Sequence, residues 1–219
     1  MKKLLVIISF VCFSFLLFSC KGSANKTSDN SSYCYADTYG YVGGETYHND
    51  YLGMTVDLKG DWFIADYNKI FEQDIETLSQ FYDEETAKKK VMSVMEHQVA
   101  LLQIFNNEKL ADADCFFKLL MNSKQSSDLV QDGRQYLQES INKITHPNIR
   151  ISGEIDTRNI GGKDFGHVRL ENNSGDHSKI FQDIYAGKIK DNIILIQLTY
   201  QDDAAYSKLE KLISGIKFE

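Results

Sequence analysis

Two parts of the chain place an apolar residue at every second position, and this spacing predicts half-buried β-strands. In the first part, Met54, Val56 and Leu58 alternate with polar neighbours. A glycine-containing turn at 59–61 then leads into a second strand that begins at Trp62. The pattern predicts a β-hairpin near the start of the folded region.

The second part predicts four strands in succession, separated by turn-forming residues. These strands cover residues 149–155, 164–171, 179–188 and 192–200. Strands that follow one another through short turns pair antiparallel. Because residues 193–196 are all apolar, the last strand is expected at the centre of a sheet that is covered on both faces. Two shorter apolar runs, 99–105 and 116–121, are expected to add buried strands.

Three other segments have the 3.6-residue period of amphipathic helices. The first follows Asp83, and the second is capped by Ser127 and ends before Pro147. The third is capped by Asp202 or Asp203. Helices combined with antiparallel strands define the α+β class, so we expect an antiparallel β-sheet flanked by helices.

The N-terminal residues form a targeting segment rather than part of the fold. Lys2 and Lys3 precede an uncharged apolar stretch, residues 4–18, which is shorter than the roughly 20 residues of a membrane-spanning helix. The stretch ends in Leu17-Phe18-Ser19-Cys20, which resembles the lipobox of bacterial lipoproteins. The resemblance implies a lipoprotein signal peptide, residues 1–19, and attachment of diacylglycerol and palmitate-like chains to Cys20. An ordinary signal peptide with a cysteine at its cleavage site is the alternative.

A polar segment follows the cysteine. Residues 20–45 are rich in Ser and Asn, which is typical of a flexible tether, and residues 46–219 are expected to form a single globular domain. Two or three acyl chains hold a protein stably at a membrane, so the membrane is the expected partner of the anchor. Lys21 stands where an aspartate marks inner-membrane retention in some bacteria, which favours the outer membrane or the cell surface.

The charge of the chain restricts its partners. The formal charge is −7, and loss of Lys2 and Lys3 with the signal peptide brings it to about −9. Nucleic-acid binders carry a basic surface, so no nucleic-acid partner is expected. An acidic domain is also repelled by anionic lipid headgroups, so the anchor rather than the domain is expected to hold the protein at the membrane.

Two stretches of the domain resemble the Mog1/PsbP-like superfamily. They are Tyr47-x-Asn49-x-Tyr51-Leu52-Gly53-x-x-Val56-x-Leu58-x-Gly60-x-Trp62 and the C-terminal Leu212-Ile213-Ser214-Gly215-Ile216-Lys217-Phe218. Within the superfamily, the pattern is similar to small bacterial lipoproteins of the DcrB-like group. The resemblance implies an αβα sandwich for residues 46–219 and carries no activity with it. Lys59 departs from the pattern, since the family usually has a proline before the Gly-x-Trp turn.

The chain lacks the common sequence motifs of catalysis and of metal or phosphate binding. No His-Glu-x-x-His, Cys-x-x-Cys or Gly-x-Ser-x-Gly occurs, so no catalytic residue, metal ligand or cofactor is predicted. His167 is expected on the solvent face of its strand. Cys34 and Cys115, which remain after lipidation of Cys20, are expected to stay unpaired, with a disulfide between them as the alternative.

Tyrosines crowd the junction between the tether and the domain. Tyr33, Tyr35, Tyr39 and Tyr41 alternate with small or polar residues, and tyrosine is favoured at binding interfaces. The functional hypothesis is that these side chains contact a partner. The simpler interpretation is that they pack across the edge of the domain's own sheet.

The sequence therefore predicts a lipid-anchored protein of the bacterial cell envelope that acts as a binding or interaction module. Its partner would be an envelope protein, an envelope polymer or a small ligand. The alternative is an envelope hydrolase whose residues, Cys115 or a His–Asp pair, meet only in the fold. A concave pocket that holds a histidine and a carboxylate within hydrogen-bonding distance would favour the hydrolase.

Overall fold

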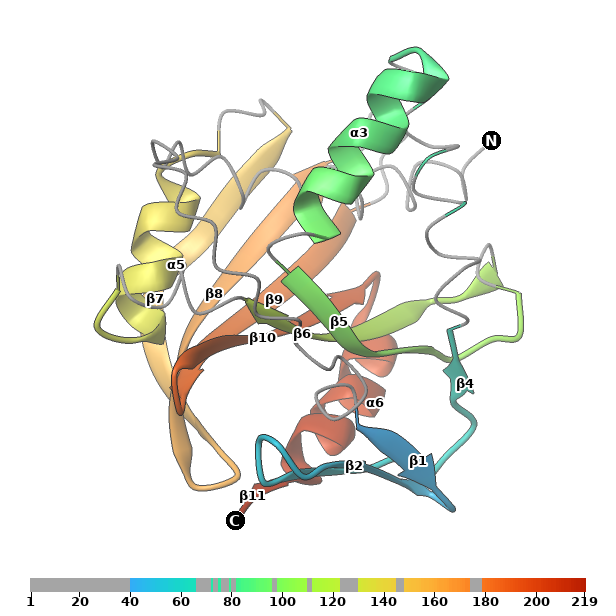
Figure 1. Ribbon diagram of the computed structural model, residues 1–219, viewed down its shortest axis with the longest axis vertical. Coiled ribbons are helices and arrows are strands. Elements are labelled where there is room, and N and C mark those ends of the chain that lie inside the picture. Colours follow the sequence, from blue (N-terminus) through green and yellow to red (C-terminus); the bar gives the residue numbers. More distant parts are fainter. Residues whose placement is uncertain are drawn as a thin grey trace, which may run out of the picture.

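The computed structural model describes residues 40–65, 72, 75, 79, 82–95, 98–109, 112–122, 130–144, 148–173 and 179–219. Within these residues the chain forms two antiparallel β-sheets together with helices α3, α5 and α6 (Figure 1). The predicted α+β class with antiparallel strands is confirmed.

The larger sheet has seven strands in the order β4-β5-β6-β10-β9-β8-β7. Their bounds are β4 (Phe63–Ile64), β5 (Gln98–Phe105), β6 (Cys115–Asn122), β7 (Ile149–Ile160), β8 (Lys163–Asn173), β9 (Lys179–Ile189) and β10 (Asn192–Tyr200). Strand β10 lies between β6 and β9, and all of its residues are buried. Its apolar run therefore occupies the central position that the sequence predicted.

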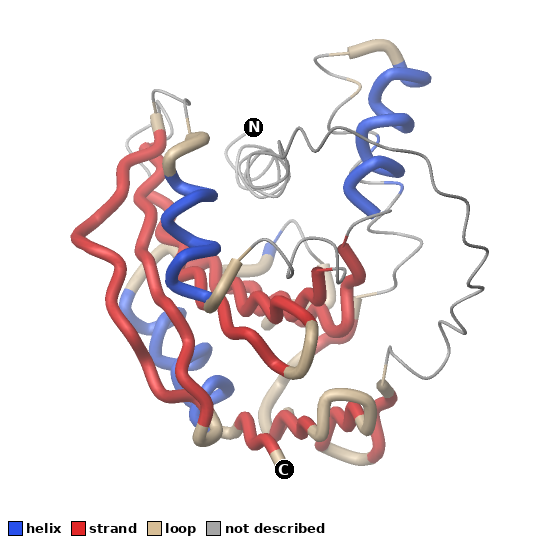
Figure 2. The backbone as a smooth tube through the Cα atoms, turned by 60° about the vertical axis from the view of Figure 1, so that its left-hand side comes forward, coloured by secondary structure: helices blue, strands red, loops and turns tan. Residues whose placement is uncertain are grey.

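A two-residue turn joins β7 to β8, and another joins β9 to β10. Gly161 and Gly162 connect β7 to β8 with φ angles of 56° and 82°, a left-handed conformation that glycine adopts without strain. Strand β7 runs to Ile160, beyond the predicted end at residue 155, and its pairing shifts between Ser152 and Asp156. The result is a long hairpin along one side of the domain (Figure 2).

The smaller sheet joins the start of the domain to its end. It has the order β1-β2-β3-β11, with β1 (Tyr41–Gly43), β2 (Thr46–Asn49), β3 (Met54–Asp57) and β11 (Ile216–Phe218). Ile216 of β11 lies opposite Val56 of β3. The two stretches that resemble the Mog1/PsbP-like superfamily are therefore neighbours in space. Strand β1 extends the sheet upstream of Thr46. The predicted hairpin between the strand at 54–58 and a strand from Trp62 is wrong, because β3 pairs with β2 and β11 whereas β4 pairs with β5 in the larger sheet.

Two hydrophobic cores lie on opposite faces of the larger sheet. On one face, α6 (Asp203–Ser214) and the smaller sheet pack against the sheet, and on the other face α5 (Gly133–Ile141) covers it. Helix α3 (Glu84–Met95) stands near β5, away from the other two helices (Figure 1). The helices and the two sheets thus form layers around the central strands.

Of the two predicted helix caps, the cap of α6 is confirmed and the cap of α5 is not. The Asp202 carboxylate accepts a hydrogen bond from the Ala205 N–H at 2.8 Å and caps α6, as predicted. The prediction of Ser127 as the cap of the preceding helix is wrong. Helix α5 begins at Gly133, because the Asp132 carboxylate accepts the Gln135 N–H at 2.8 Å.

Helix α5 approaches the sheet through glycine. A Cβ atom on Gly133 would lie 1.7 Å from the Ala186 carbonyl oxygen of β9. On β8, a Cβ atom on Gly166 would lie 2.7 Å from the Arg134 Cα atom. Since neither backbone atom can yield as a flexible side chain does, these glycines set the distance between α5 and the sheet.

Candidate functional site

A groove of about 730 Å³ lies where the β3–β4 turn meets the second half of α6 and the start of β11. Residues 57 and 59–62 contribute one wall. Lys208 and Lys211 of α6 and Lys217 of β11 contribute to the other side. The groove is thus lined mainly by the two sequence stretches that carry the superfamily resemblance.

The β3–β4 turn presents Trp62 to the groove in a defined position. The Trp62 N–H donates to the Gly60 carbonyl oxygen at 3.0 Å, and Gly60 has a φ angle of 127°. A Cβ atom on Gly60 would lie 3.3 Å from the indole Nε1 atom, so the indole edge packs closely on this glycine. Trp62 is partly buried against the core, and its remaining surface lines the groove.

Lys59, which departs from the family pattern, strengthens this turn. Its backbone N–H donates to Asp57 Oδ1 at 3.1 Å, and its Nζ atom lies 3.3 Å from Asp57 Oδ2. A proline at this position would have no N–H to donate. The pKa of the Asp57 carboxyl is held below its ordinary value, mainly by this backbone hydrogen bond, so Asp57 is ionised at neutral pH.

The turn is also attached to the end of α6. The Asp57 N–H donates to the Gly215 carbonyl oxygen at 3.3 Å. A Cβ atom on Gly215 would lie 2.9 Å from the Asp57 Cβ atom. The two sides of the groove are therefore in direct contact at its base, which fixes the distance between Trp62 and the lysines of α6.

The groove has the opposite charge to the chain. Its lining contains four lysines and two aspartates, a formal charge of +2, whereas the whole chain carries −7. Lys59 is paired with Asp57. In the part of the chain that the structure describes, no ion pair involves Lys208, Lys211 or Lys217. These three ammonium groups can therefore attract an anion.

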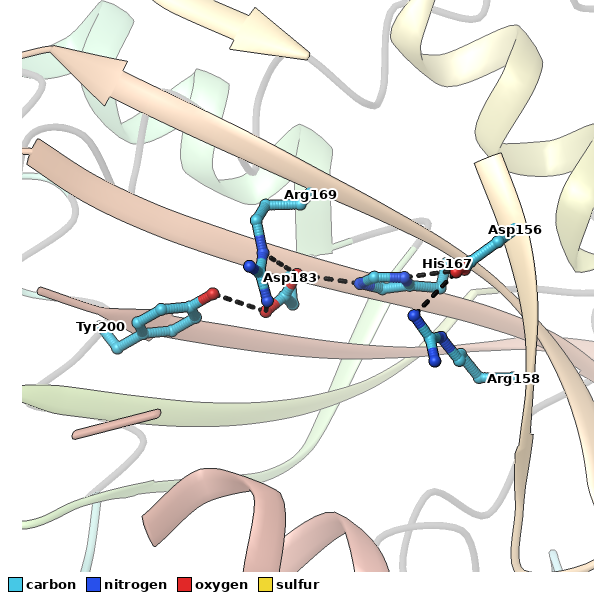
Figure 3. A network of polar contacts seen from close by, with 6 residues as sticks. All are labelled: Asp156, Arg158, His167, Arg169, Asp183 and Tyr200. Carbon is cyan, nitrogen blue, oxygen red and sulfur yellow. Dashed lines mark hydrogen bonds and ion pairs between the residues drawn. The ribbon is translucent and has the colours of Figure 1, made fainter. Parts of the chain in front are cut away.

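A second polar cluster, the buried charge network, lies on strands β7 to β10, on the same face of the sheet as α6. Asp183 has no exposed side-chain surface, and both of its carboxylate oxygens accept hydrogen bonds. Oδ1 lies 2.8 Å from His167 Nε2 and 2.9 Å from Arg169 Nε. Oδ2 lies 3.0 Å from Arg169 Nη2 and 2.7 Å from the Tyr200 hydroxyl (Figure 3).

The network extends from Asp183 to the edge of the sheet through His167. The imidazole Nδ1 lies 2.8 Å from Asp156 Oδ1 on β7, and Arg158 pairs with the other oxygen of Asp156 at 2.8 Å. His167 is 9 % exposed, so its predicted place on a solvent face is wrong. The side chain does point away from Val168, but α6 and its surroundings cover that face of the sheet as well.

The protonation states in the network favour a structural role. Burial alone would raise the pKa of Asp183, but hydrogen bonds from His167, Arg169 and Tyr200 bring it below its ordinary value. Burial raises the pKa of Tyr200, and the nearby Asp183 carboxylate raises it further. The phenol therefore stays a hydrogen-bond donor. This His–Asp pair is not part of the lining of the groove.

Most of the other predicted site residues lie in the part of the chain that the structure does not describe. Cys20, Cys34, Tyr33, Tyr35 and Tyr39 lie outside the described residues, so lipidation, the disulfide alternative and most of the tyrosine hypothesis stay predictions. Tyr41 lies on β1 with 58 % of its surface exposed, and its ring stacks on His48 at 5.1 Å between centroids. Exposure leaves it accessible to a partner.

Cys115 is fully buried and forms no disulfide with another described residue. Burial raises its pKa to about 11, so little nucleophilic thiolate is present at neutral pH. Among the described residues, no group of three or more His, Cys, Asp or Glu side chains is placed to hold a metal ion. In the same residues, no helix combines the length and apolarity of a membrane span.

The sequence interpretation did not identify the groove as a site. The sequence pattern assigns no role to Lys208 or Lys211, and it places Trp62 at the start of a strand. A usable signal was present in the three-residue spacing of the two lysines, which places them on one helix face in an otherwise acidic chain.

Comparisons with known proteins find solved structures that are similar to parts of this chain at low sequence identity. No protein-family profile matches the chain, and no curated protein matches it. A crystal structure from Bacteroides thetaiotaomicron is similar with a TM-score of 0.41 and 10% identity, covering 76% of this chain and 45% of the other. This chain therefore spans less than half the length of that protein.

Two further solved structures are similar over most of both chains. LpqN of Mycobacterium tuberculosis, described as involved in cell envelope biogenesis, has a TM-score of 0.43 and 11% identity, with 75% and 82% coverage. The cyanobacterial PsbP of Synechocystis has a TM-score of 0.46 and 10% identity, with 82% and 96% coverage.

Proposed function

We propose that this chain is a lipid-anchored protein of the bacterial cell envelope that acts by binding, and that the groove is its binding site. The observation that carries the proposal is the lining of the groove. It combines one aromatic ring, Trp62, with three lysines that form no ion pair with another described residue, and both kinds of group recognise ligands. The His–Asp pair that could support hydrolysis is buried in the network, outside this lining.

Two features of the sequence support the proposed location in the cell envelope. The lipobox-like Leu17-Phe18-Ser19-Cys20 predicts the anchor, and the polar residues up to 45 predict a tether. A domain on such a tether reaches a partner near the membrane without lying on the lipid surface.

Site-specific crosslinking in intact cells tests the proposal. A benzoylphenylalanine at position 214, in place of exposed Ser214, would lie in the groove without removing a lysine, and one at position 139, on exposed Glu139 of α5, is the matched control. We expect a light-dependent adduct with an envelope component from position 214 only. Equal adducts from both positions, or none from position 214, would contradict binding through the groove.

A further inference from the structure

We propose that the ligand of the groove is an anionic sugar polymer of the envelope. A sugar ring would pack on Trp62, and its carboxylate or phosphate groups would contact the lysines. This inference rests on the proposed function, because it names the ligand class of the same groove.

The charge of the groove selects an anion. Lys208, Lys211 and Lys217 form no ion pair with described residues, so their charge is available to a ligand. The groove lining carries +2 in a chain whose formal charge is −7, so its charge is opposite in sign to that of the chain as a whole. Electrostatic attraction therefore directs a negatively charged ligand to this groove.

The spacing of the charges suits a repeating polymer. Lys208 and Lys211 are three residues apart on α6, which places their Cβ atoms about 5–6 Å apart. This spacing is comparable to the length of one sugar unit in a chain. Lys217, on β11, lies in the same lining and provides a third contact. Successive charged units of one chain can therefore meet successive lysines.

Trp62 provides the aromatic surface that sugar recognition needs. The apolar C–H face of a sugar ring packs on an aromatic ring, and a large ring that is already held in place loses little entropy on binding. The contact with Gly60 and the core holds the indole, as described above. The position of Trp62 is thus set before a ligand arrives.

The alternative of an acidic peptide fits the structure less well. Extended peptides commonly bind by adding a strand to an open sheet edge. The outer edge of β11 is covered by the β7–β8 turn, where a Cβ atom on Gly161 would lie 2.8 Å from the Ile216 carbonyl oxygen. The open strand next to Trp62, β4, has only two residues. Neither edge supports a long peptide ladder.

A fluorescence titration of the full-length lipidated protein in neutral detergent tests this inference. Trp62 is the only tryptophan in the chain, so its emission reports directly on the groove. The probes are hexagalacturonate, which carries carboxylates, and mannopentaose phosphate, which carries a phosphate. Neutral maltohexaose and the sugar-free acid hexaglutamate are the comparison ligands.

We expect a saturable change with at least one anionic oligosaccharide, about tenfold or more tighter than with either comparison ligand, and weaker at high salt. The tighter of the two anionic probes identifies carboxylate or phosphate as the recognised group. The double variant Lys208→Gln/Lys211→Gln should weaken binding about tenfold or more. Its control, Lys88→Gln/Lys163→Gln, removes the same charge from exposed positions outside the groove and should bind normally.

A further variant, Trp62→Ala, examined by calorimetry, should bind about tenfold more weakly while keeping its unfolding transition. Equal binding of hexaglutamate or maltohexaose would overturn the sugar-polymer class, as would no response to either anionic oligosaccharide. If the oligosaccharides fail to bind while position 214 still forms a specific adduct in cells, only the ligand class is wrong. If both experiments fail, the proposed function is wrong as well.

Discussion

His167 Nε2 lies 2.8 Å from Asp183 Oδ1, and the carboxylate that it faces has no exposed surface. The second ring nitrogen faces Asp156, so one imidazole connects β7, β8 and β9 by side chains. A carboxylate only accepts hydrogen bonds when ionised, so both contacts are hydrogen bonds only if both ring nitrogens carry a proton. The network thus adds cross-strand contacts to the backbone ladder at the edge of the larger sheet.

Removal of the buried carboxylate should destabilise the fold strongly. Asp183→Ala would leave Arg169 and His167 without their shared partner, and loss of one member of a buried pair costs about 3–5 kcal/mol. The matched change Asp156→Ala affects a carboxylate that is 45% exposed, and should cost about 1 kcal/mol or less. Urea unfolding measures the free energy of unfolding of both variants. An equal decrease in this free energy in the two variants would contradict the central role of Asp183.

The same carboxylate should make stability depend on pH. Because the folded-state pKa of Asp183 lies below its ordinary value, its stabilising contribution is complete above the unfolded pKa of about 3.9 and is lost as the pH falls through the lower folded value. The difference in unfolding free energy between wild type and Asp183→Ala should therefore shrink below about pH 4. A difference that stays constant on acidification would exclude this linkage.

Gly133→Ala should weaken the packing of α5. Its Cβ atom would overlap the Ala186 carbonyl group, and overpacking against backbone costs typically about 1–3 kcal/mol or more. Gly43→Ala is the control, because the nearest atom would lie at an ordinary 3.5 Å. Thermal unfolding should show a lower midpoint for the first variant and little change for the second. A normal midpoint for Gly133→Ala would show that α5 can move away from the sheet.

The Cys115 thiol should be unreactive in the folded protein. It is fully buried, and burial raises its pKa to about 11. A thiol reagent such as Ellman's reagent should therefore react with it only after unfolding. Without a reductant, two thiols of the unfolded mature chain should react if Cys34 and Cys115 are unpaired. No thiol should react if the two cysteines form a disulfide.

Because Cys20 is the predicted site of lipidation, we expect the mature protein to carry radioactive palmitate at this residue. Wild type should incorporate radioactive palmitate, and Cys20→Ala should not, because the acylated sulfur and the new N-terminus are lost. Cys115→Ala is the control and should be labelled like wild type. Labelling that persists in Cys20→Ala would contradict the lipobox interpretation.

Local patterns in the sequence predicted the elements whose signals are strong. The continuous apolar run at 193–196 identified the central strand, and the adjacent glycines 161 and 162 identified a hairpin turn. The start of α5 was misplaced because Ser127 and Asp132 are both good caps, and the choice between them depends on tertiary packing. Periodicity alone cannot rank two such caps.

The sites depend on contacts between distant residues, which patterns do not show. His167 alternates with Val168, and alternation normally predicts one buried and one solvated face. Here both faces of the sheet are covered, so the polar residue is buried with its partners. In the same way, Trp62 and Lys208 share a groove only because β11 returns to β3.

The pairing of β3 with β11 also has a consequence for the order of folding. Val56 and Ile216 are opposite each other but 160 residues apart in the chain. During synthesis, the β2–β3 hairpin emerges long before its second neighbour exists, and an isolated hairpin is only marginally stable. Completion of the smaller sheet therefore waits for β11, and deletion of residues 216–218 would leave β3 without its second neighbour and the groove without Lys217.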